Sequence, residues 1–177
     1  MEQKKSDQSK NLPEELRMVK ELVYDPCGFV LTDLTLASES KEYAACTFLL
    51  GKRSVVYRAA KITPTKTGQF VTIWKRKKGG PIEPYNSSDD IDFIIISTAA
   101  HDRSGQFIFT KSILIEKGIV SHLDKEGKRG IRVYSPWDKA LNKQALQTQQ
   151  WQSAFFLETT AGQAIDFNLA KQLIKNK

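Results

Sequence analysis

Three aspartates just before the most apolar segment of the chain have clear potential for metal chemistry. Asp89, Asp90 and Asp92 precede the run Phe93 to Ser97. A hard cation such as Mg²⁺ needs two or three converging carboxylate oxygens, and magnesium nucleases often hold one of them at a strand end. Asp92 is therefore a candidate catalytic carboxylate. The alternative is a solvated loop in which the aspartates only cap turns.

A magnesium site at Asp92 needs a second carboxylate. A nuclease would be expected to carry it on the next strand, two residues before a lysine, but Gln106 to Thr110 contains no acid. Glu42 and Glu116 are the remaining candidates. A magnesium-dependent nuclease is therefore kept as an alternative, and Mg²⁺ is expected only if it holds.

Other catalytic and cofactor-binding motifs are missing from the sequence. The two histidines, His101 and His122, and the two cysteines, Cys27 and Cys46, do not have the spacing of a zinc site. There is no G-x-S-x-G nucleophile elbow, and neither G-x-G-x-x-G nor G-x-x-x-x-G-K-[ST] occurs. No cofactor and no metal site are predicted from these motifs.

Positive charge is concentrated in one part of the chain. Between Glu42 and Glu83 there is no acidic residue, and nine Lys or Arg residues fall in that stretch, against a formal net charge of +7 for all 177 residues. A one-sided field of this kind attracts polyanions. The residues of this stretch expected to hold phosphates are Arg58, Lys61, Lys66, Lys75 and Arg76.

The basic stretch also has the pattern of a β-hairpin. Val55 to Ile62 and Phe70 to Trp74 are rich in β-branched and aromatic residues, and Thr63 to Gly68 between them contains a proline and ends in a glycine. Cations would thus alternate with aromatics on a rigid support, where Trp74 or Tyr57 would stack on a base. The alternative is a solvated edge hairpin whose aromatics belong to the core.

A second basic cluster follows in the loop Ser121 to Gly130 and the short strand predicted at Ile131 to Tyr134. Acidic residues in this loop lower the net positive charge of the cluster. Its contribution to nucleic-acid binding is expected to rise if it folds beside the hairpin. The predicted contributors are Lys128, Arg129 and Arg132.

Length and composition indicate one globular domain. Residues 1–10 are polar and expected to be flexible, and residues 11–177 are predicted to form the domain. The two isolated cysteines favour a reducing compartment. The N-terminus has no apolar segment, and no stretch approaches the length of a membrane span, so we expect a cytoplasmic protein with no membrane partner.

The predicted fold class is α+β, with a central, mostly antiparallel sheet of five or six strands flanked by N- and C-terminal helices. Phe93 to Ser97 is predicted as a central strand, because an unbroken apolar run is covered on both faces. Tyr43 to Leu50 and the two strands of the hairpin are expected to form a three-stranded meander. Helices are predicted at 11–24, around 141–155 and at 162–175.

Several segments resemble the MepB family. They are ESKEYAACTF (39–48), YRAAKITPTKTGQFVTIWKR (57–76), GQFIFTKSILIEKGIVS (105–121), EGKRGIRVYSPWD (126–138) and QALQTQQWQSAFF (144–156). The resemblance implies a single compact α/β domain and a role with nucleic acid. The order of the predicted elements indicates a distant likeness to restriction-endonuclease-type folds.

The leading hypothesis is a nucleic-acid-binding protein whose basic hairpin holds the phosphate backbone of DNA or RNA. Under this hypothesis, changing Lys75 and Arg76 to Ala flattens the salt dependence of binding. A nuclease using Asp92 with Glu42 or Glu116 is the second hypothesis. A protein-binding accessory module, tied to a transporter or a regulator, is the third.

Overall fold

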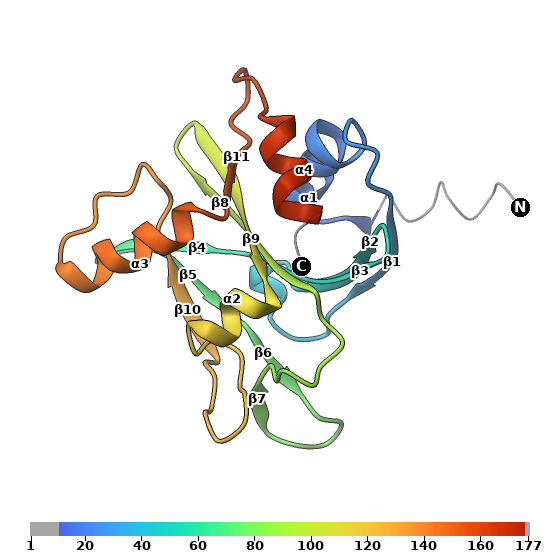
Figure 1. The fold of residues 1–177 in the computed structure, drawn as a ribbon, viewed down its shortest axis with the longest axis vertical. Helices are drawn as coiled ribbons and strands as arrows, with labels where there is room; N and C mark the ends of the chain where they lie inside the picture. Colours follow the sequence, from blue (N-terminus) through green and yellow to red (C-terminus); the bar gives the residue numbers. More distant parts are fainter. Residues whose placement is uncertain (1–10, 176–177) are drawn as a thin grey trace, which may run out of the picture.

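A six-stranded sheet forms the centre of the molecule (Figure 1). The computed structural model describes residues 11–175. Four of its five strand pairs are antiparallel, and the pair β3–β8 is parallel. The prediction of an α+β fold with a mostly antiparallel sheet is confirmed. In spatial order the strands are β1 (Leu31–Leu36), β2 (Cys46–Leu50), β3 (Arg53–Ala59), β8 (Phe93–Ala100), β9 (Arg103–Thr110) and β11 (Phe156–Glu158).

Strand β8 lies in the middle of this sheet, as its apolar run predicts. All residues from Phe93 to Thr98 are buried. Ile95 belongs to the core on one face of the sheet, and Ile94 and Ile96 belong to the core on the other. The alternation of side chains along a strand explains this division, and the sheet therefore has a helical or sheet layer on each side.

The terminal helices cover one face of the sheet, also as predicted. Helix α1 (Glu14–Val19) continues as the π-helical turn η2 (Lys20–Tyr24) and lies beside α4 (Phe167–Lys175) in Figure 1. Beneath them, the Tyr24 hydroxyl donates to Gln106 Oε1 at 2.7 Å. Gln106 in turn donates to Ser97 Oγ at 3.0 Å. This buried network ties the N-terminal helix to the two central strands, because each buried polar group finds a partner.

The other face is covered by a second, three-stranded sheet and two helices. The second sheet has the order β10 (Gly130–Val133), β5 (Lys66–Thr72), β4 (Lys61–Thr63). The helices are α2 (Lys111–Glu116) and α3 (Lys143–Ser153). Aromatic rings fill the space between the layers, with Phe109 5.2 Å from Trp151 between ring centroids. This layer supplies the surface on which the candidate site lies.

The predicted three-stranded meander is wrong. Strand β2 does pair with β3, but β5 does not, because both edges of β3 are already taken by β2 and β8. The chain leaves the central sheet after Ala59, where the Ala60 N–H donates to the Ser97 carbonyl.

The basic hairpin is therefore built from different strands than expected. It consists of β4 and β5, and the chain then turns at Ile73 into β6 (Trp74–Arg76), which pairs with β7 (Ile82–Pro84). The one remaining short helix is η3 (Lys41–Tyr43).

Within residues 11–175 no helix is long and apolar enough to cross a membrane. The segment 1–10, predicted to be flexible, lies outside the described residues.

Candidate functional site

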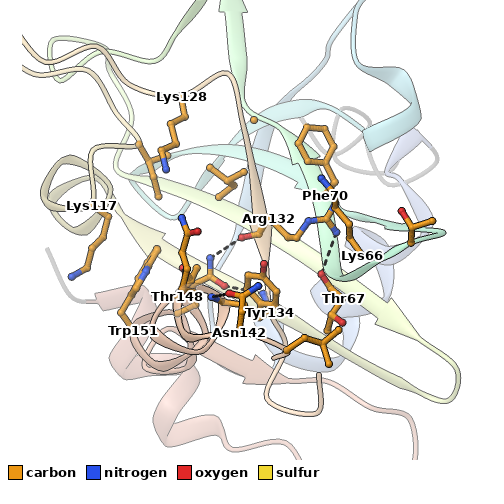
Figure 2. A pocket seen from close by; sticks show the side chains of 18 residues that line it. Lys66, Thr67, Phe70, Lys117, Lys128, Arg132, Tyr134, Asn142, Thr148 and Trp151 are labelled. Carbon is orange, nitrogen blue, oxygen red and sulfur yellow. Dashed lines mark hydrogen bonds between the residues drawn. The ribbon is translucent and has the colours of Figure 1, made fainter. Parts of the chain in front are cut away.

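A groove of about 770 Å³ lies between the second sheet and α3 (Figure 2). Its floor is formed by β10 and β5, one wall by residues along the length of α3, and one end by the residues that follow α2. Figure 2 shows Lys117 and Trp151 toward one end, Lys66 and Phe70 toward the other, and Arg132 and Tyr134 between them. The two basic clusters of the sequence meet here, because β10 pairs with β5 along its whole length.

The charge of the groove has one sign. Four of its lining residues are cations, and none of the described lining residues is an acid. Lys66 and Lys128 are exposed and form no ion pair with a described residue, whereas Lys117 pairs with Glu116 at 3.0 Å. The cations are Lys66, Lys117, Lys128 and Arg132.

Arg132 is held in place on the floor of the groove. Its Nη1 donates to the carbonyls of Thr67 at 3.3 Å and Gly68 at 3.1 Å, and its Nη2 donates to Thr63 Oγ1 at 3.0 Å. A guanidinium has five N–H donors, so two remain for a ligand. It forms no ion pair with a described residue, and its positive charge is therefore available to an anion.

Aromatic rings stand among these cations. Tyr134 lies against the backbone of Gly68, which has φ +77°; a Cβ there would come within 2.8 Å of the tyrosine ring. Glycine is thus required both by the left-handed backbone and by the approach of the ring. Trp151 has the Lys117 ammonium 5.8 Å from its ring centroid. Rings of this kind, partly exposed beside cations, can stack on bases.

The site includes residues that the sequence analysis missed. Lys117 is not among the predicted contacts, and Tyr134 is predicted only as the end of the strand Ile131 to Tyr134. The period of two along a strand could have found Tyr134, since it shares a face with the predicted contact Arg132. No local signal links Lys117 to the groove.

Arg58, a predicted phosphate contact, is only 4% exposed. Its Nη1 donates to the carbonyl of Tyr57 at 2.8 Å and its Nη2 to that of Trp74 at 3.4 Å, while Nε has no partner among the described residues. The side chain points into the layer between the sheets, so it does not belong to a surface that meets a ligand. Tyr57 is fully buried and likewise cannot stack on a base.

Lys75 and Arg76, also predicted contacts, are neutralised by acids from other segments. Lys75 Nζ lies 2.5 Å from Asp89 and 3.4 Å from Glu83. Partial burial lowers the pKa of Lys75, but its hydrogen bonds and charge interactions with the two acids outweigh burial and raise it. Arg76 Nε lies 2.9 Å from Glu39. Their charge is offset locally, and neither residue lines the groove.

The remaining predicted contacts are divided between the groove and the surface around it. Lys61 is exposed on β4, with its ammonium 5.5 Å from the ring centroid of Tyr43. Trp74 is partly buried beneath Arg76. Arg129 pairs with Glu126 at 2.7 Å. Of the nine predicted positions, the structure gathers three in the groove: Lys66, Lys128 and Arg132.

The candidate catalytic acids are engaged in other interactions or lie apart on the surface. Asp92 accepts from the Ser54 backbone N–H at 2.9 Å and faces Arg53 at 3.6 Å. Glu116 pairs with Lys117, and Glu42 is exposed on η3. Within residues 11–175 no group of three or more His, Cys, Asp or Glu is placed to hold a metal ion. This arrangement offers no support for the magnesium site.

The fold and the sequence place this chain in a known family. The model of the MepB-like family matches residues 37–158. A solved structure, the crystal structure of MepB, is similar with a TM-score of 0.70 and 39% sequence identity over 73% of this chain and 87% of that chain. No curated protein matches. The chain belongs to the MepB-like family, as its sequence segments indicate.

Proposed function

We propose that the groove binds nucleic acid, with phosphates on its cations and a base on one of its aromatic rings. The observation that carries the proposal is the composition of the lining: four cations, three aromatic rings and no acid among the described residues. Most protein surfaces mix both signs of charge. A concave site that excludes acids while exposing rings has the features of a nucleic-acid-binding channel.

The footprint proposed here differs from the one expected from sequence. Phosphate contacts come from Lys66, Lys128 and Arg132 rather than from the paired Lys75 and Arg76, and Lys117 is left out because it pairs with Glu116 at 3.0 Å. A cation already neutralised by an acid at 2.5–3.4 Å must lose that partner before it can gain from a phosphate. Unpaired cations pay no such cost and release counterions from the nucleic acid directly.

The rings favour contact with bases outside a duplex stack. Phe70, Tyr134 and Trp151 line the groove, and base–aromatic stacking contributes about 1–3 kcal/mol per base. Such a base must be unpaired or extruded. The proposed ligand is therefore DNA or RNA with accessible bases.

Fluorescence anisotropy with labelled single- and double-stranded DNA and RNA tests the proposal. Each oligonucleotide is titrated at several salt concentrations, with and without Mg²⁺. We expect binding whose log affinity falls linearly with log salt, and oligonucleotides that stay intact. Binding that is absent, or that does not respond to salt, would contradict the proposal. Cleavage that requires Mg²⁺ would favour the nuclease, and salt-independent capture of a protein would favour the accessory module.

A further inference from the structure

The outer edge of β10 has no neighbouring strand within residues 11–175. Strand β10 is the first strand of the three-stranded sheet, and β5 is its one strand partner in the part of the chain that the structure describes. An unpaired edge exposes backbone N–H and C=O groups, and their burial without partners is costly. The groove lies along this part of the molecule, so whatever satisfies the edge also shapes the site.

Helix α3 supplies the missing partner through one side chain. Gln152 Oε1 accepts from the Tyr134 backbone N–H at 2.8 Å, and Gln152 Nε2 donates to the Arg132 carbonyl at 3.1 Å. A residue of a parallel strand would bond to the same two groups, the carbonyl and the N–H on either side of one residue. The side-chain amide of Gln152 thus replaces one residue of a strand.

The two residues that Gln152 fixes are the two that occupy the floor of the groove. Arg132 and Tyr134 are two positions apart on an extended chain, so their side chains share a face, and both line the groove. Gln152 is only 1% exposed, which keeps water from competing for its hydrogen bonds.

We propose that Gln152 is a positioning residue for the groove: its amide holds the main chain of β10 so that Arg132 and Tyr134 face a bound strand together. The proposal rests on the function proposed above. Gln152 touches no ligand in this scheme and acts only through the two residues that it orients.

Helix α3 also offers a matched control. Gln149, one turn earlier, donates to the carbonyls of Ser135 at 2.8 Å and Asp138 at 2.7 Å. It therefore makes as many hydrogen bonds from the same helix to the same part of the chain. Neither of its partners lines the groove.

The test compares Gln152→Met with Gln149→Met. Both variants keep the length of the side chain and lose two hydrogen bonds. For folded protein, verified by circular dichroism and a thermal melt, we expect Gln152→Met to bind a labelled single-stranded oligonucleotide about tenfold more weakly. Its salt slope should be shallower by about 0.7, the value for one lost phosphate on a single strand. Gln149→Met should keep the affinity and slope of the wild type.

A merely structural role of Gln152 lowers the folded fraction but leaves the salt slope of the folded molecules unchanged. A folded Gln152→Met protein with the wild-type slope and affinity would overturn the inference. If that variant does not fold, Gln152→Asn, which stays neutral but is one methylene shorter and cannot reach both the Tyr134 N–H and the Arg132 carbonyl, is measured in the same way with the same expectation.

A second measurement needs no variant. In nitrogen-edited NMR spectra of the wild type, oligonucleotide addition should shift the Tyr134 backbone amide and the Gln152 side-chain amide, but not the side-chain amide of Gln149. Unchanged Tyr134 and Gln152 signals in a protein that does bind would overturn the inference. A wild type that binds no oligonucleotide would instead refute the proposed function itself.

Discussion

Removing two unpaired lysines from the groove should flatten the salt dependence of binding, whereas removing two paired cations elsewhere should not. The groove variant is Lys66→Ala with Lys128→Ala. Three of the lining cations, Lys66, Lys128 and Arg132, form no ion pair with a described residue. If each of these three neutralises one phosphate of a single strand, the wild-type slope of log affinity against log salt is about −2.1, and the variant slope is about −0.7. Between 50 and 200 mM salt the affinity then falls about 18-fold for the wild type and about threefold for the variant.

The control variant is Lys75→Ala with Arg76→Ala. It removes the same formal charge, but from side chains that Asp89, Glu83 and Glu39 already neutralise. We expect its slope to stay close to that of the wild type. The assay is fluorescence anisotropy at equal protein concentrations over a salt series, with thermal melts to show that both variants are folded.

Equal flattening of the salt slope by the two double variants would contradict this prediction. Binding would then follow the net charge of the whole molecule, and the local pairing of Lys75 and Arg76 would have no influence. A slope unchanged only in the groove variant would place the phosphate contacts on Lys75 and Arg76, which the sequence alone also predicts.

Three further predictions test the structure around the groove. Gly68→Ala should lower the free energy of unfolding by about 2–4 kcal/mol, since it combines left-handed strain with a clash against Tyr134. Gly51→Ala, where φ is +63° and a Cβ meets open space, should lower it by about 1 kcal/mol, and urea melts compare the two variants. Cys46 is buried, and burial raises its pKa to about 12, so at pH 8 only about one thiol in 10⁴ is ionised. Iodoacetamide should therefore modify Cys46 only when the protein unfolds, and mass spectrometry detects the modification. Arg58→Met should leave the salt slope of binding unchanged. It should lower the free energy of unfolding by less than about 1 kcal/mol, or raise it, because a buried guanidinium without an acid gains little from its charge. A flattened slope would show that Arg58 does contact the nucleic acid.

Local pattern was sufficient to predict the buried central strand and the terminal helices. The run at 93–97 is apolar at every position, which requires cover on both sides, and β8 is the buried middle of the sheet. The terminal helices were equally visible, since their apolar residues recur at helical spacing and pack on one face. The family could also be predicted, because the five segments that carry the resemblance all fall within the matched range 37–158.

Strand pairing was beyond local pattern. The sequence between 55 and 74 has the signals of a hairpin, but the edges of β3 are filled by β2 and by β8, which comes more than thirty residues later. Only the complete sheet determines which edges stay free. The hairpin is therefore formed by β4 and β5, and the second basic cluster lies beside it because β10 pairs with β5.

The order of residues alone shows that positive charge is concentrated between Glu42 and Glu83 and that aromatic residues lie among those cations. Which of those charges can meet a ligand depends on the folded structure. Lys75 finds its acid 14 positions away and Arg76 finds its acid 37 positions away, while Arg58 is buried between two layers. Charge neutralisation and burial depend on distances through space, and the order of residues along the chain does not contain them.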